Sequence, residues 1–354
     1  MRVVVLGLSI TSSWGNGHAT NYRALVRALE ARGHEVLFLE RDVPWYAEHR
    51  DGEVGARVEL YRSLADLRRR FGGDVHAADL VLVGSFVPQG SAVGAWVTRE
   101  ARGVTGFYDI DTPVTLAAVE AGECDYLSRE LVPRYDLYLS FTGGPTLDRL
   151  EREFGARCAR AFYCLVDPEL YRPVATEPRY LLGYLGTYGA DRQPALDALL
   201  LEPARRLRGE RFVVGGPQYP PGVDWPANVD RVEHVPPDDH PRFYCAQRVT
   251  LNVTRRAMVD AGWSPSVRLF EAAACGVPIL SDRWPGLDEF FVPGEEILTA
   301  DTADEASALL SGLNTDDLVQ IAHRARRRVL REHTAERRVA LLEGLVHERA
   351  RAAA

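Results

Sequence analysis

The hydrophobic and polar positions of the chain alternate between two patterns that together are typical of a parallel α/β protein. Short apolar runs predict buried strands, and the amphipathic stretches between them predict helices. Residues 21–31 show the helical pattern, and Gly33 follows them as a stop signal. The strands predicted in the first half are residues 2–8, 35–39, 80–83, 104–108 and 137–141.

The same alternation begins again after a short connector, residues 166–173, which holds two prolines and few apolar residues. The strands predicted after it are residues 180–185, 211–214, 249–253 and 277–280, and the last predicted helices are residues 303–313, 316–331 and 334–351. A chain of 354 residues is also long for one hydrophobic core. We therefore expect two Rossmann-like domains facing across a cleft, residues 1–170 and 171–332. A C-terminal helix, residues 333–354, is expected to pack back toward the first domain.

Composition narrows the class of partner. The net charge of -8 is spread along the chain without a basic stripe, which argues against nucleic acid. No run approaches the roughly 20 apolar residues of a membrane span. The five cysteines show no metal-ligand spacing, which favours free thiols in a reducing compartment. We expect a cytoplasmic protein with no membrane span. All 42 basic residues are arginine, so a bound anion must be held by arginine, histidine or backbone amides.

The loops that follow the strands are the first candidates for a site, because ligands of open parallel sheets bind outside the carboxyl ends of the strands. After the first strand, Gly15 and Gly17 allow close backbone approach, and a helix start at Thr20 offers amides to an anion. Glu40 would suit a dinucleotide fingerprint, but the third glycine position is Thr20 and the loop is too long. His18 either binds substrate or caps the helix.

Two further loops of the first domain carry candidate residues. Asp109 and Asp111 stand two apart at a strand end, so in extended chain they share a face that could line the cleft; a plain turn is the alternative. A carboxylate there could accept a proton from a ligand hydroxyl. Gly143 and Gly144 follow the next strand, and Pro145 suits a first helical turn. That loop fits a ligand contact and a structural turn equally well.

The second domain offers a glycine loop and a helix start. Gly186 allows close backbone approach after the strand at 180–185, and Arg192 could neutralise a diphosphate or lie on the surface. Ser266 favours an N-cap, so Ser266, Val267 and Arg268 begin a helix whose amides could bind phosphate. Glu271 lies three residues after Arg268 and could accept from ribose hydroxyls; the alternative is a surface ion pair.

The segment Phe-Glu-Ala-Ala-Ala-Cys-Gly-Val-Pro at residues 270–278 resembles the donor-site helix of GT-B glycosyltransferases of the group 1 (GT4-like) type. With the Gly-Thr-Tyr loop at 186–188 and Pro-Gly-Leu at 285–287, residues 180–332 resemble its CgeB-type branch. The resemblance implies that Glu271 binds the donor ribose. Trp263 stands where the family usually has a sugar-contacting glutamate, and Thr187 and Arg192 stand where it has arginine and lysine.

The resemblance also implies a GT-B fold and a metal-independent glycosyltransferase that moves a sugar from a nucleotide-diphosphate sugar to a hydroxyl-bearing acceptor. No cofactor and no metal are expected, because helix amides and arginine supply the positive potential; the Asp-x-Asp spacing of Asp109 and Asp111 is the alternative metal signal. Backbone around Val235 is the candidate base contact. If the reaction inverts configuration, Asp111 is the first candidate base and His18 the second.

Two alternatives share this fold. A nucleotide-sugar epimerase would need acid and base groups around the sugar and no second substrate. A non-catalytic nucleotide-binding module would fit the altered position at Trp263.

Overall fold

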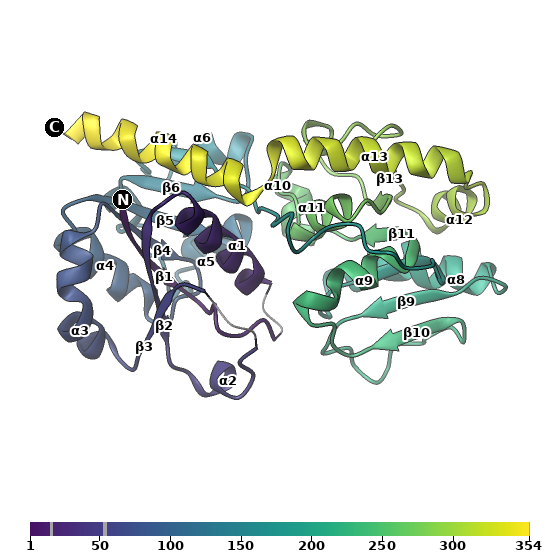
Figure 1. Cartoon of the computed structure of the whole chain (residues 1–354), viewed down its shortest axis with the longest axis horizontal. Helices are drawn as coiled ribbons and strands as arrows, with labels where there is room; N and C mark the ends of the chain where they lie inside the picture. The colour runs from purple at the N-terminus through teal and green to yellow at the C-terminus, as the bar shows by residue number, and fades with distance from the viewer. Residues whose placement is uncertain (15–16, 52–54, 354) are drawn as a thin grey trace. The chain divides into compact units, whose positions relative to one another are not determined.

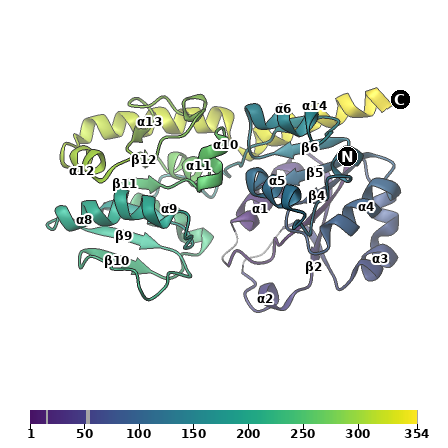
Figure 2. The same cartoon turned by 180° about the vertical axis from the view of Figure 1, so that it is seen from behind.

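The computed structural model describes residues 1–14, 17–51 and 55–353 and divides into two compact units (Figures 1 and 2). The N-terminal unit comprises Met1–Leu165 and Ala335–Ala354, and the C-terminal unit comprises Val166–Thr334. Each unit contains its own parallel sheet with helices. No helix among the described residues is long and apolar enough to cross a membrane.

The N-terminal unit is built on a seven-stranded parallel sheet in the order β3-β2-β1-β4-β5-β6-β7. All five residues of β4 and all six of β5 are buried, as expected of central strands covered on both faces. The strands are β1 (Arg2–Gly7), β2 (Glu35–Arg41), β3 (Arg57–Tyr61), β4 (Leu80–Gly84), β5 (Val104–Asp109), β6 (Leu137–Ser140) and β7 (Ala159–Ala161). The helices are α1 (His18–Ala31), α2 (Pro44–Ala47), α3 (Leu64–Ala77), α4 (Gly90–Glu100), α5 (Thr112–Ala121), α6 (Pro145–Arg152) and α14 (Ala335–Ala353).

The last helix of the chain, α14, belongs to this unit and packs against α1 (Figure 1). Glu343 on α14 accepts from Arg32 Nε at 2.9 Å and Nη2 at 2.6 Å, and lies 2.7 Å from His34 Nε2. The Arg32 guanidinium, and then His34, lower the pKa of Glu343 to about 2. Arg338 Nε also donates to the Tyr163 carbonyl at 3.0 Å. These polar contacts join the C-terminal helix to the N-terminal unit.

The C-terminal unit has a six-stranded parallel sheet in the order β10-β9-β8-β11-β12-β13. Its strands are β8 (Tyr180–Leu185), β9 (Phe212–Gly215), β10 (Val229–Val232), β11 (Gln247–Asn252), β12 (Ile279–Ser281) and β13 (Leu298–Thr299). Its helices are α7 (Gln193–Leu196), α8 (Glu202–Arg206), α9 (His240–Cys245), α10 (Arg256–Ala261), α11 (Val267–Ala274), α12 (Ala303–Ser311) and α13 (Thr315–Glu332), with a π-helical turn at Asp197–Leu201. The buried core of this unit is mostly aliphatic and includes Leu182, Leu251 and Leu280.

The predicted fold class, two α/β units with parallel sheets, is confirmed, and every strand predicted from the sequence is present. Four strands that the pattern does not predict, β3, β7, β10 and β13, are the outermost strands of the two sheets. An edge strand buries little, and in β3 only Tyr61 is buried. Its sequence therefore lacks the continuous apolar run that marks the central strands.

Candidate functional site

The start of α11 lies at the carboxyl end of the C-terminal sheet and carries the candidate phosphate ligands. Ser266 occupies the N-cap position with extended backbone, and Val267 is the first helical residue, as predicted. The Ser266 hydroxyl does not cap the helix; it donates to Asn252 Oδ1 at 2.7 Å. Asn252 is the last residue of β11, so this bond fixes the helix start to the end of a central strand.

Arg268, in the first turn of α11, contacts both β11 and the neighbouring strand β8. Its Nε donates to the Leu185 carbonyl at the end of β8 at 2.5 Å, and its Nη1 donates to Asn252 Oδ1 at 3.1 Å. The guanidinium carbon lies 4.6 Å from the centre of the Tyr184 ring, a cation–π contact. The charge is therefore held in place at the carboxyl ends of β8 and β11 before any ligand binds.

Asn252 also belongs to a buried network of hydrogen bonds with Thr254, Ser281 and Asp282. Asn252 Nδ2 donates to Ser281 Oγ at 2.9 Å and to Thr254 Oγ1 at 3.2 Å. Asp282 accepts from the Thr254 amide at 3.1 Å and from its hydroxyl at 2.9 Å. Burial raises the pKa of Asp282 to about 6, and the Thr254 hydrogen bonds oppose that rise. None of these residues was a candidate from the sequence, although Asn252 lies in the predicted strand at 249–253 and the other three follow the predicted strands at 249–253 and 277–280.

The glycine loop after β8 lies beside Arg268. A Cβ on Gly186 would come within 2.8 Å of Arg268 Nη2, and a Cβ on Gly216 would lie 2.1 Å from the Gly186 carbonyl oxygen. Glycine is required at Gly216 for a second reason, since its φ is +137°. Arg192 Nη2 donates to the Thr187 carbonyl at 2.6 Å. The structure thus brings Gly186, Thr187, Arg192 and Arg268 to one edge of one sheet.

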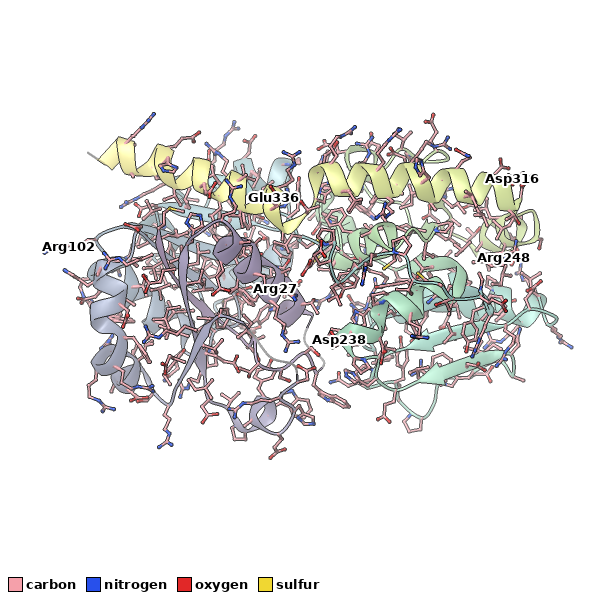
Figure 3. The ribbon with its side chains drawn as sticks, in the orientation of Figure 1. Arg27, Arg102, Asp238, Arg248, Asp316 and Glu336 are labelled. Atoms are coloured by element: carbon pink, nitrogen blue, oxygen red, sulfur yellow. The ribbon has the colours of Figure 1, made fainter. Side chains whose placement is uncertain are left out.

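Glu271 lies one turn further along α11 and is only 5% exposed. The Tyr244 hydroxyl donates to its Oε2 at 2.9 Å, so Glu271 is not a member of the surface ion pair that was the alternative. Val235 follows β10, and its carbonyl lies 3.1 Å from His240 Nε2. Asp238, labelled in Figure 3, is on the 3-10 turn Pro237–Asp239 directly after this loop.

Trp263 contacts a neighbouring loop. Its indole Nε1 donates to Glu289 Oε1 at 2.5 Å, and its ring packs so closely on Gly286 that a Cβ there would lie 2.6 Å from it. The backbone of Trp263 is left-handed, with φ +45°. The residue at the position of the sugar-contacting glutamate therefore shapes the loop at 285–289.

In the N-terminal unit, the loop after β1 is held by Glu40. Its buried carboxylate accepts from the Ile10 amide at 2.7 Å and from the Thr11 amide at 3.0 Å, besides the hydroxyls of Ser9 and Thr11. This occupied carboxylate gives a physical reason against the dinucleotide alternative, in which Glu40 would receive ribose hydroxyls.

Most candidate residues of the loops after β1 and β6 lie at or beside the start of a helix. Gly15 is outside the described residues. Gly17 is the N-cap of α1, which begins at His18, two residues before the predicted start. The His18 ring lies 5.4 Å from that of Phe86. Gly144 precedes Pro145 at the start of α6 with φ +55°, and a Cβ on Gly143 would lie 2.0 Å from the Tyr163 hydroxyl.

Asp109 is fully buried, which corrects the expectation that it shares an open face with Asp111. The Tyr138 hydroxyl donates to one carboxylate oxygen at 2.6 Å and the Thr115 hydroxyl to the other at 2.7 Å. The chain turns at Asp111, the N-cap residue of α5, which is partly exposed. Of the two aspartates, Asp111 is therefore the partly exposed one. Among the described residues, no three His, Cys, Asp or Glu come together to hold a metal ion.

Burial of Asp109 predicts a specific pH dependence of stability. Desolvation raises the pKa of Asp109 from 3.8 to about 6, so the folded protein binds its proton more tightly than the unfolded chain. Stability should therefore fall as the pH rises from about 4 to about 6, by on the order of 3 kcal/mol for a shift of this size. Asp109→Asn should remove this component. Urea unfolding of both proteins between pH 4 and 7 measures it, and Asp282 contributes equally to both; parallel curves would contradict the assignment.

Comparisons with known proteins bear on the fold and on the class of enzyme. Residues 192–344 match a protein family described as glycosyl transferase-like. No curated protein sequence matches the chain. Among solved structures, sucrose-phosphate synthase from Thermosynechococcus elongatus is similar over 100% of both chains, with TM-score 0.72 and 16% identity.

Two further similar structures were solved with UDP or UDP-glucose bound. Anabaena HepE in complex with UDP and glucose matches with TM-score 0.68 and 15% identity over 97% of this chain and 99% of its own. An α-glucosyltransferase in complex with UDP-glucose and DNA containing an abasic site matches with TM-score 0.71 and 13% identity over 98% and 99%. The chain has the GT-B fold. Together with the family match, the fold supports an enzyme of the glycosyltransferase class.

Proposed function

We propose that the chain transfers a sugar from a nucleoside-diphosphate sugar to a hydroxyl-bearing acceptor, as a member of the CgeB-type branch. The observation that supports this most strongly is the arrangement around α11. Arg268 and the first amides of α11 supply positive potential for a diphosphate, and Glu271 follows one turn later to accept from ribose hydroxyls. All of these residues lie within the stretch that matches the family.

The neighbours in complex with UDP and UDP-glucose make UDP-glucose the first donor to test. The N-terminal unit, through Asp111, His18 and the loop at Gly143 and Gly144, is proposed to contact the acceptor.

No disulfide joins any of the five cysteines, all of which lie in the described part of the chain, and this fits the cytoplasmic location that we propose.

Release of UDP that depends on an added acceptor tests this function. We expect turnover of UDP-glucose only in the presence of a hydroxyl-bearing acceptor from a small-molecule panel. An epimerase would instead convert UDP-glucose without an acceptor and release no UDP. Binding of UDP with no conversion of any donor would favour the non-catalytic alternative.

Removal of divalent metal should leave the reaction intact. Arginine and helix amides provide the charge that a metal would otherwise supply to the departing diphosphate. Turnover in EDTA should therefore stay within about twofold of turnover in added Mg²⁺ or Mn²⁺. Loss of activity in EDTA with recovery in Mn²⁺ would show that a metal is required.

Replacing Glu271 by alanine should weaken UDP binding about 10- to 100-fold, because hydrogen bonds to a charged acceptor contribute about 1.5–3 kcal/mol. Titration calorimetry measures this directly. Glu271→Gln keeps an acceptor for Tyr244 and separates the loss of ribose contact from local destabilisation. Glu296→Ala, which removes another partly buried carboxylate of this unit, paired with Arg328, is the control. Equal affinity in Glu271→Ala and the parent protein would remove Glu271 from the site.

A further inference from the structure

A chain of polar groups runs from Tyr171, close to Glu271, to the Val235 loop. The Tyr171 hydroxyl lies 3.0 Å from His240 Nδ1, and His240 Nε2 lies 3.1 Å from the Val235 carbonyl oxygen. Tyr171 is 3% exposed and belongs to the connector before β8. Neither Tyr171 nor His240 was a candidate from the sequence. Both now lie between the two groups assigned to the nucleoside of the donor.

The positions of the protons follow from the partners. A carbonyl oxygen only accepts, so His240 Nε2 must carry a hydrogen and donate it to Val235. Burial lowers the pKa of His240, so the ring is neutral near pH 7 and Nδ1 is an acceptor. The Tyr171 hydroxyl therefore donates to Nδ1.

The same hydroxyl has a second acceptor within reach. The Glu271 carboxylate lies close enough that, after burial, its charge is the next cause that raises the pKa of Tyr171. Tyr171 has one proton, so donation to His240 excludes donation to Glu271. Among the described residues, the Tyr244 hydroxyl is then the one side-chain donor to the carboxylate, which keeps acceptor capacity for a ligand.

We propose that His240 and Tyr171 are positioning residues for the donor nucleoside: His240 accepts the Tyr171 hydroxyl proton and thereby keeps the Glu271 carboxylate open to ribose hydroxyls. This inference rests on the proposed function, specifically on ribose binding by Glu271. Without the His240 ring, the Tyr171 hydroxyl turns to Glu271 and occupies the acceptor position that a ribose hydroxyl needs.

The test compares two probes, UDP and 2′,3′-dideoxyuridine diphosphate, which lacks the ribose hydroxyls. The ratio of their affinities is the ribose preference, and it is insensitive to changes in the Val235 loop that affect both probes equally. In His240→Leu we expect the ribose preference to fall about tenfold, the contribution of one hydrogen bond to a charged group. In the double variant His240→Leu/Tyr171→Phe the competing hydroxyl is absent, and the preference should return to within about twofold of the parent value.

Each outcome decides one question. An unchanged ribose preference in His240→Leu would overturn the proposal, and so would a preference that stays low in the double variant, since His240 would then act by packing alone. A parent protein that binds both probes equally would contradict ribose binding by Glu271, which is a failure of the proposed function. Tyr171→Phe alone should keep the preference, and a tenfold rise there would overturn the proposal, because it would show that Tyr171 already donates to Glu271 in the parent protein.

Discussion

Replacing Arg268 by alanine is expected to lower turnover of UDP-glucose by about two to three orders of magnitude, the usual effect of losing one preorganised donor to a developing negative charge. When the bond to the sugar breaks, charge collects on the leaving diphosphate. Arg268 is already oriented by the Leu185 carbonyl, Asn252 and the Tyr184 ring, so its side chain needs little reorganisation as that charge develops. Arg268→Lys should recover only a small part, because an ammonium cannot keep both bonds of the guanidinium fork.

Binding measurements separate this role from a structural one. UDP affinity should fall in Arg268→Ala, while affinity for uridine, which lacks the diphosphate, should stay within about twofold. Arg256→Ala is the matched control, since Arg256 is an exposed arginine of the same unit that pairs with Asp260. An equal loss of UDP and uridine affinity would mean that α11 has moved, and the diphosphate contact would then lack support.

The parts of the site that the sequence predicted are those that lie close together along the chain. Arg268 and Glu271 lie on one helix and Ser266 is its N-cap, so their spacing alone places them on neighbouring turns. Asn252 and Tyr244 orient Arg268 and Glu271 from 16 and 27 residues away, respectively. Such partners meet only through the order of the strands in the sheet, which no local pattern contains. The same holds for Tyr171, which lies 69 residues from His240.

For Asp109, by contrast, a local sequence pattern led to a wrong prediction. The spacing of Asp109 and Asp111 predicts a shared face only if the chain stays extended, but the chain turns into α5 at Asp111. Asp109 closes β5 inside the unit, where Tyr138 and Thr115 donate to it. A polar residue at a strand end reads the same in the sequence whether it points into the unit or out of it. An inward-pointing residue is recognised by buried hydroxyl groups that donate to it. Only the folded structure shows which hydroxyl groups lie there.

The stereochemistry of the product determines the role that we assign to Asp111. Transfer to a hydroxyl acceptor requires the hydroxyl to lose a proton as the new bond forms. In an inverting reaction a side chain must take that proton, and Asp111, partly exposed at the start of α5, is the first candidate with His18 second. In a retaining reaction the leaving phosphate can take it, and neither side chain is then needed as a base.

Asp111→Asn keeps the shape and most hydrogen bonds of the side chain and removes its basicity. With an inverted product we expect turnover at saturating UDP-glucose to fall roughly 10²- to 10⁴-fold, the range of a general base. With a retained product we expect a loss below about tenfold, because the phosphate then acts in its place. Asp109→Asn is the matched control: the Asp109 carboxylate is fully buried, so its loss should act on stability and leave turnover of the folded protein largely unchanged. Turnover measured together with the anomeric configuration of the product decides the matter, and an inverted product with a loss below tenfold would exclude Asp111 as the base and direct the same test to His18.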